Sequence, residues 1–269
     1  MNNLHRELAP ISDAAWAQIE EEASRTLKRH LAARRVVDLE GPKGLELAAV
    51  GTGHRRQIQA PGAGIQAAQR AAKALVELSV AFELTRQAID DVERGAKDSD
   101  WSTLKEAAKK IAFAEDRSVF DGYDAAGIQG IRQGSSNPAL TLPSNARGYP
   151  GAVAQAVSQL RLAGVNGPYA LVLGAEAYTA ASGRSDEGYP VFDHIERVVD
   201  GGIIWAPAIE GAFVVTTRGG DFELDIGQDI SIGYQSHTST VVELYLQETF
   251  TFRLLTTEAA VVLAAGEKK

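Results

Sequence analysis

The sequence of 269 residues predicts an α+β fold. Two long stretches in its first half carry apolar residues at helical spacing, and its C-terminal stretches alternate apolar and polar residues as a β-sheet does. Between them, short helices alternate with short apolar strands, which indicates a compact α/β region. Hydrophobic residues make up 45% of the chain and charged residues 23%, so a sizeable core is expected without further staples.

The composition also excludes several classes of protein. The chain has no cysteine, which rules out disulfides and thiolate metal sites. Its formal net charge of -8 disfavours nonspecific binding of nucleic acid by the chain as a whole. No apolar run is long enough to span a membrane, and the stretch MNNLHREL lacks the apolar region of a secretory signal.

The first predicted helix covers residues 13–34. Ser12 is a natural N-cap, and Ile11 and Trp16 stand where a hydrophobic staple places its two members. The apolar stripe of this helix consists of Trp16, Ile19, Ala23, Leu27 and Leu31.

Residues 45–78 are predicted to form a projecting two-stranded arm. Glycine and polar residues dominate residues 51–64, and residues 76–84 alternate as a strand does. Ala67–Ala74 is rich in alanine, which favours a helix there.

A second long helix is predicted over residues 101–123, with Asp98, Ser99 and Asp100 before it for capping. A third helix begins at Pro150 and ends at Gly164. The elements predicted after it are a strand over 169–173, helices over 176–181 and 191–199, strands over 203–205 and 213–216, and long alternating runs over 222–234 and 241–255.

No catalytic constellation stands out from the residues themselves. His194 lies near Ser185, Asp186 and Asp193 in sequence, but a nucleophile elbow is missing and sequence proximity does not build a triad. None of the five histidines has metal-ligand spacing with another. We therefore expect no enzyme activity, no cofactor and no metal site, and favour an assembly or interaction protein.

Several longer stretches together resemble the encapsulins, especially actinobacterial members described as linocin-type bacteriocins. They include MNNLHRELAPISDAAWAQIE, SSNPALTLP, RLAGVNGPYALVLGAEAY, DEGYPVFDHI and LYLQETFTF. This resemblance covers nearly the whole chain and implies the fold of phage major capsid proteins. It also implies a division into a peripheral domain (1–44, 79–134 and 218–269), an extended loop (45–78) and an axial domain (135–217).

The resemblance implies a cytoplasmic nanocompartment shell with oxidative-stress or iron-storage roles. Closure by identical copies requires about sixty of them, and long arms suit such a shell. The expected partners are further copies of the chain and a cargo enzyme, either a dye-decolourising peroxidase or a ferritin-like protein, with no nucleic acid and no membrane. A prophage or viral capsid of the same fold is the alternative, and a peptidase or bacteriocin is less favoured. The first predicted helix starts too early to leave room for a scaffolding segment, which favours the nanocompartment.

Two sites follow from the resemblance. The family's inner-wall groove binds the C-terminal targeting peptide of the cargo, and the residues expected there are Leu4, Ile11, Arg34, Asp38, Ile230, Ile232 and Tyr234. The alternative is that Ile230 and Ile232 only pack on the first helix. The loop expected to line a five-fold pore consists of Gly183, Arg184, Ser185, Asp186, Glu187, Gly188 and Tyr189, with an exposed loop of no selective role as its alternative.

Overall fold

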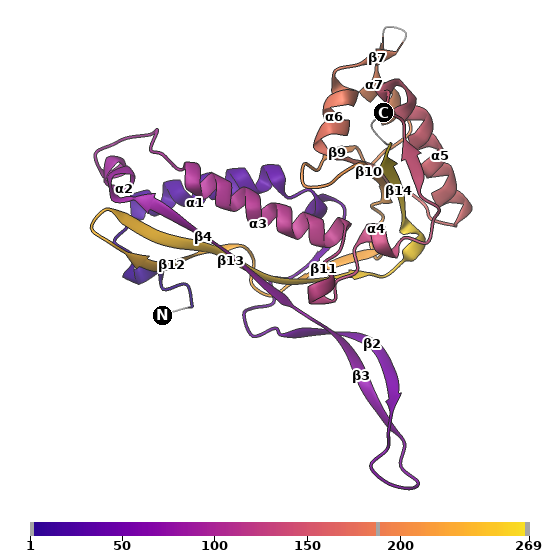
Figure 1. The fold of residues 1–269 in the computed structure, drawn as a ribbon, viewed down its shortest axis with the longest axis horizontal. Coiled ribbons are helices and arrows are strands. Elements are labelled where there is room, and N and C mark those ends of the chain that lie inside the picture. Colours follow the sequence, from indigo (N-terminus) through magenta and orange to yellow (C-terminus); the bar gives the residue numbers. More distant parts are fainter. Residues whose placement is uncertain (1–2, 187–188, 267–269) are drawn as a thin grey trace.

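The computed structural model describes residues 3–186 and 189–266. These residues form two five-stranded sheets, a two-stranded arm and a two-stranded hairpin (Figure 1). Glu187 and Gly188, which we expected in the pore loop, lie outside the described residues. None of the helices in the described part is both long and apolar enough to cross a membrane.

The first sheet is built around β13 (Val241–Leu254), its longest strand. β4 (Val76–Thr85) pairs antiparallel along one edge of β13. β11 (Phe222–Ile226) and β12 (Ser231–His237) follow one another along the other edge, and β1 (Asp38–Glu40) pairs parallel with β11. The alternation predicted for β13 is confirmed over residues 241–247, where Val242, Leu244 and Leu246 are buried between partly exposed neighbours. Residues 248–252 are all buried, and Leu254, predicted on the same face, is partly buried.

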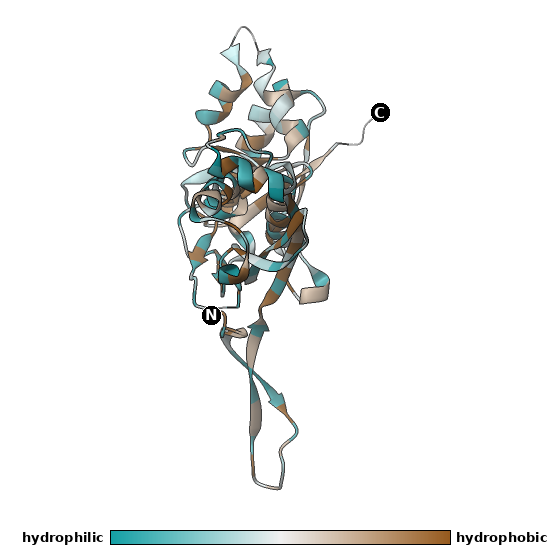
Figure 2. Ribbon diagram, turned by 90° about the vertical axis from the view of Figure 1, so that its left-hand side faces the viewer, coloured by the Kyte–Doolittle hydropathy of each residue, from teal (hydrophilic) through white to brown (hydrophobic). Residues whose placement is uncertain are grey.

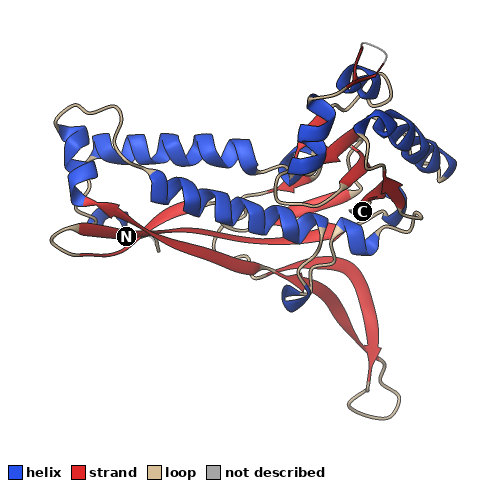
Figure 3. Cartoon of the chain, turned by 45° about the horizontal axis from the view of Figure 1, so that its top comes forward, coloured by secondary structure: helices blue, strands red, loops and turns tan. Residues whose placement is uncertain are grey.

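Two long helices run side by side along one face of this sheet (Figure 3). They are α1 (Asp13–His30) and α3 (Ser102–Phe120), and the capping of α1 by the Ser12 hydroxyl is confirmed. The first helix ends at His30 rather than at residue 34, because the buried carboxylate of Asp116 accepts hydrogen bonds from the next backbone N–H groups. A further helix, α2 (Arg86–Glu93), was not predicted.

The second sheet has the strand order β5-β14-β10-β6-β9. Its strands are β5 (Leu140–Leu142), β14 (Ala260–Ala265), β10 (Ala212–Thr216), β6 (Tyr169–Leu173) and β9 (Ile203–Trp205). The strand over 169–173 is confirmed, whereas β5 and β14 were not predicted. β14 belongs to the range 218–269 of the peripheral domain, yet it pairs with β10. The domain division therefore stays a prediction, and this pairing places a strand from the predicted peripheral range inside the sheet of the predicted axial range.

Short helices and turns complete the second half of the chain. The α-helices packed around the second sheet are α5 (Tyr149–Leu162), α6 (Ala175–Ser182) and α7 (Val191–Glu196), and α4 (Ile131–Gly134) precedes them. The small hairpin pairs β7 (Ser185–Asp186) with β8 (Tyr189–Pro190). The 3₁₀ helices are η1 (Arg6–Leu8), η2 (Ala33–Arg35), η3 (Asp124–Ala126), η4 (Ala146–Gly148) and η5 (Thr257–Ala259).

The arm consists of β2 (Ala49–Ile58) and β3 (Ala67–Ala74), which pair antiparallel and project away from both sheets (Figure 1). The helix predicted for Ala67–Ala74 is wrong. An isolated helix of this length is marginal in water, whereas pairing with β2 satisfies the backbone groups of the segment. Polar and apolar residues are intermixed along the arm, so it has no apolar stripe to bury against the body (Figure 2).

Candidate functional site

The N-terminal segment lies against β12, the strand that carries Ile232 and Tyr234 and is directly preceded by Ile230. The backbone N–H of Tyr234 donates to the carbonyl oxygen of Leu4 at 2.8 Å. The Tyr245 hydroxyl donates to the carbonyl oxygen of Asn3 at 3.1 Å, and the Asn3 amide donates to Gln228 at 3.1 Å. Leu4 and Tyr234, which are far apart in sequence, are therefore neighbours.

The apolar face of β12 turns toward α1. Ile232 is only 6% exposed and belongs to the core cluster that also contains Trp16 from α1. Ile11, Ile230 and Tyr234 are partly buried and pack against the same cluster. Ile232 therefore packs against the first helix, as the alternative interpretation expects. The side chains of Ile11, Ile230 and Tyr234 remain partly exposed.

Arg34 is the centre of a buried polar network that the sequence analysis missed. Its Nε and Nη2 atoms donate to the two carboxylate oxygens of Glu115 on α3, at 2.9 and 2.5 Å. Its Nη1 atom lies 2.8 Å from Asp229, and its Nη2 atom lies 3.5 Å from Glu248 on β13. The Arg34 side chain is only 15% exposed, so its guanidinium interacts mainly with these three carboxylates rather than with water.

The network ends at the junction between β11 and β12. Asp229 lies in that junction and has a side chain that is 49% exposed. The side chains of Glu115 and Glu248 are fully buried. The same Asp229 oxygen accepts the backbone N–H of Ile230 at 2.8 Å. Arg34 therefore holds the backbone that presents Ile230. The signal in the sequence is Glu248, a charged residue at a position of β13 whose alternate neighbours are all apolar.

Burial dominates the titration of this region. It raises the pKa of Glu248 well above its ordinary range, and the nearby charge and hydrogen bond of Glu115 add to the effect. Burial also raises the pKa of Asp116 from 3.8 to about 7, against the N–H groups of Ala33 and Ala32 that favour its charged form. Burial opposes the charge of Arg34, but Glu115 and Asp229 outweigh it and raise the pKa of Arg34.

These shifts predict that stability falls as the pH rises from about 4 to about 7. A carboxyl group whose folded pKa is raised binds its proton more tightly in the folded state, so ionisation costs stability until the folded pKa is passed. For Asp116 the loss is at most about 4 kcal/mol. Asp221 has a lowered pKa, through Arg218 and Thr256 acting against burial, so its contribution is lost only below this window.

The measurement is the free energy of unfolding across this pH range for the wild type and for Asp116→Asn. We expect the wild type to lose stability with rising pH and the variant to show a flatter dependence, because its amide does not titrate. A wild-type stability that increases from pH 4 to pH 7, or an unchanged slope in the variant, would contradict the assignment.

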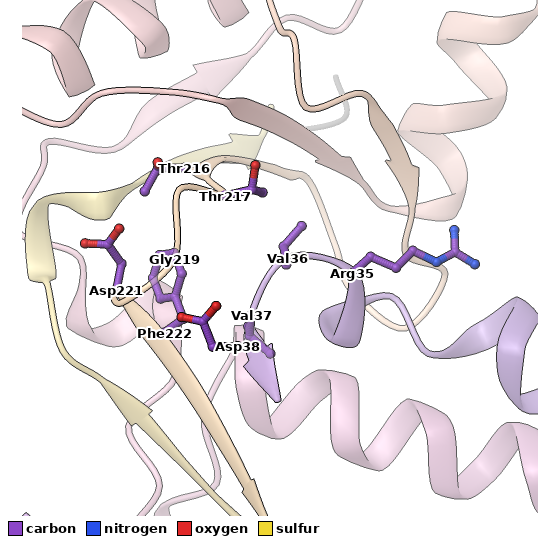
Figure 4. Close-up of a pocket in the computed structure, with 9 residues that line it drawn as sticks. All are labelled: Arg35, Val36, Val37, Asp38, Thr216, Thr217, Gly219, Asp221 and Phe222. Atoms are coloured by element: carbon purple, nitrogen blue, oxygen red, sulfur yellow. The ribbon is translucent and has the colours of Figure 1, made fainter. Parts of the chain in front are cut away.

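Asp38 lies at the opposite end of the β11–β12 edge from Tyr234. It pairs with Glu223 at the start of β11, seven residues before Ile230, which is about 20 Å along a strand. Its carboxylate accepts the N–H of Gly220 at 2.5 Å and lines a cavity of about 80 Å³ (Figure 4). The other residues that line this cavity are Arg35, Val36, Val37, Thr216, Thr217, Gly219, Asp221 and Phe222. The structure thus separates Asp38 from Ile230 and Tyr234.

The predicted pore loop forms the tip of the β7–β8 hairpin. The carbonyl oxygen of Arg184 accepts the N–H of Val191 at 3.1 Å, and the Arg147 guanidinium donates to the carbonyl oxygen of Ser185 at 3.3 Å. Gly183, Arg184 and Ser185 are exposed, as is Tyr189. The described part of the loop is therefore held at its base, with the side chains of Arg184, Ser185 and Tyr189 exposed.

The triad that sequence proximity suggested does not form among the described residues. His194 packs edge-on against the ring of Tyr189, with the ring centroids 6.0 Å apart. In the part of the chain that the structure describes, no hydrogen bond joins His194 to Ser185 or Asp193, so it has no activated nucleophile there.

Comparison with known proteins gives a consistent answer. The Linocin_M18 family, described as "Encapsulating protein for peroxidase", matches residues 1–251. The chain is 61% identical over 264 residues to a type 1 encapsulin shell protein of Rhodococcus erythropolis, covering 98% of this chain and 100% of the relative. It is 60% identical to the type 1 encapsulin shell protein of Mycobacterium tuberculosis, with the same coverage.

Solved structures place the fold among those of virus-like particles and phage capsids. The virus-like particle of Pyrococcus furiosus matches with a TM-score of 0.65 at 15% identity, covering 92% of this chain and 98% of that one. A chain of Gordonia phage Cozz matches with a TM-score of 0.55 at 14% identity, covering 89% of this chain and 87% of that one. With the fold and the sequence in agreement over nearly their whole length, this chain belongs to the encapsulin shell proteins and is a structural protein rather than an enzyme.

Proposed function

We propose that this chain assembles into a closed icosahedral shell of about sixty copies and encloses a cargo enzyme in the cytoplasm. The observation that carries this proposal is the arm. A two-stranded hairpin without a covering layer is marginally stable in water at best, and β2 and β3 have no such layer within the chain. The large exposed hydrophobic residues include Leu45, Ile58 and Ile65, all in or beside the arm. A neighbouring copy that covers the arm would remove both defects.

A peroxidase is the cargo that the family description supports, with a ferritin-like protein as the other candidate. The proposed binding site for the C-terminal peptide of the cargo is the exposed part of the surface formed by Ile11, Ile230 and Tyr234. Asp229 adds a half-exposed carboxylate beside it. This combination suits a short peptide that brings apolar side chains together with a hydrogen-bond donor or a cation.

Asp38 fits this proposal only as a contact for the far end of the peptide. The distance of about 20 Å from Ile230 corresponds to about six residues of extended chain. The loop that contains Arg184 and Ser185 is proposed to line a pore of the shell. The exposed side chains of Arg184 and Ser185 would then set which small charged molecules reach the cargo.

The test is co-expression of the chain with a peroxidase carrying its native C-terminus, followed by purification, electron microscopy and mass spectrometry of the shells. We expect hollow shells that contain the enzyme. Tyr234→Asp should give intact shells with reduced cargo, and Thr238→Asp, on the exposed turn after β12, should load normally.

Three results would contradict the proposal in different ways. The absence of shells at every salt concentration would remove the shell function itself. Shells of Tyr234→Asp that carry as much enzyme as the wild type would remove only the proposed peptide site. Shells filled with nucleic acid, measured by absorbance at 260 nm, would favour a viral capsid instead.

A further inference from the structure

The arm is the basic part of an acidic chain. Residues 49–74 contain no Asp or Glu and carry Arg55, Arg56, Arg70 and Lys73. Because the whole chain has a net charge of -8, everything outside the arm carries -12. Within the described residues, none of these four cations forms an ion pair with a carboxylate, although Arg56 bonds Gln69 and Lys73 bonds the carbonyl oxygen of Gly127.

Arg55 and Arg70 stand directly opposite each other in the register of β2 and β3. Side chains at such paired positions share one face of the ribbon and lie close together, and like charges there destabilise the pairing. Both residues are exposed. The isolated chain thus keeps two arginines side by side without a counter-charge.

The first sheet has a matching arrangement of opposite sign. Glu83 of β4 and Glu243 of β13 are register partners. Their sequence neighbours Phe82, Leu84 and Val242 are buried, so the two glutamates lie on the sheet face that points away from α1 and α3. Glu243 accepts a hydrogen bond from the Ser236 hydroxyl, but in the described residues neither glutamate has an ion pair with a cation.

The two charge pairs of one chain cannot meet each other. β3 leads through Leu75 into β4, and the thirteen residues from Arg70 to Glu83 span about 40 Å of extended chain. The arm joins β4 at its N-terminal end, whereas Glu83 lies near its C-terminal end, beside α2 (Figure 1). A contact between the pairs must therefore join two copies. Repeated head to tail, such a contact forms a ring if its rotation closes.

We propose that the Arg55–Arg70 pair of one copy docks on the Glu83–Glu243 pair of a neighbouring copy in the shell. This inference rests on the proposed shell function and identifies the surface that receives the arm. Each cross-strand pair supplies the counter-charges that the other lacks, and paired guanidinium and carboxylate groups form directed hydrogen bonds as well. The contact fixes the position of the arm, because docking that is shifted away from Glu83 and Glu243 leaves both charge pairs without counter-charges.

The test uses charge reversal in the full-length chain. Arg55→Glu with Arg70→Glu should reduce the fraction of protein in shells by about ten-fold or more at equal concentration, as should Glu83→Arg with Glu243→Arg. The variant that combines all four reversals should recover shells. The matched controls are Arg56→Glu, on the other face of β2, and Glu77→Arg, at a position of β4 opposite Thr249, which should assemble as the wild type does.

Shell content is measured by native mass spectrometry and microscopy, and circular dichroism verifies that each variant is folded. Normal assembly of both double variants would overturn the contact. So would a folded variant with all four reversals that fails to recover shells. Intact shells that lose bound nucleic acid after reversal of the arginines would also overturn it and assign the arm to an anionic polymer. A wild type that forms no shells would instead refute the proposed function on which the inference rests.

Discussion

Replacing Arg34 with alanine is expected to lower the free energy of unfolding by about 3–5 kcal/mol, because it leaves buried charge without a partner. Arg34 bonds both oxygens of Glu115 and reaches Glu248, and both carboxyl groups are fully buried. It also ties η2, which follows α1, to α3 through Glu115 and to the β11–β12 junction through Asp229. The substitution therefore removes the contacts that join η2, α3, the β11–β12 junction and β13.

The measurement is thermal or urea unfolding of the purified variant beside the wild type. Arg35→Ala is the matched control, since Arg35 is exposed and only bonds the carbonyl oxygen of Lys28. Adding Glu115→Gln to Arg34→Ala should recover part of the loss by removing the stranded charge. A loss below about 1 kcal/mol for Arg34→Ala would show that water reaches the network and screens it.

Ile232→Asp is expected to cost about 4–5 kcal/mol, at the upper end of single substitutions, because it buries a carboxylate in an apolar cluster. Ile232 is almost completely buried beneath α1, beside Trp16 and Ile19. The variant should therefore fail to assemble, or assemble poorly, before any question of cargo arises.

The control for this substitution is Ile230, two residues earlier and directly before the same strand. Ile230 is only partly buried, so Ile230→Asp should fold and report on cargo loading rather than on stability. The two variants are compared by thermal unfolding and by the amount of enzyme that co-purifies. Equal stability of Ile232→Asp and the wild type would mean that α1 moves away from β12 in solution.

Local rules in the sequence predicted much of the architecture. Ser12 and the apolar spacing behind it placed the start of α1, because capping and helical periodicity involve only near neighbours. The wholly buried strand β6 and the alternating run of β13 were recognised for the same reason. The resemblance of longer stretches then identified the family, which no short motif in the chain could do.

Elements decided by distant contacts escaped this reasoning. Ala67–Ala74 has the composition of a helix, yet its backbone groups find partners in β2. α1 stops at His30 because Asp116, more than eighty residues later, captures the N–H groups that follow. The candidate site shows the same division, since the sequence selected Arg34 and Ile232 but could not reveal that Ile232 is buried or that Arg34 bonds buried carboxylates. Burial and long-range hydrogen bonds depend on which segments the completed fold brings together, so only the tertiary structure decided them.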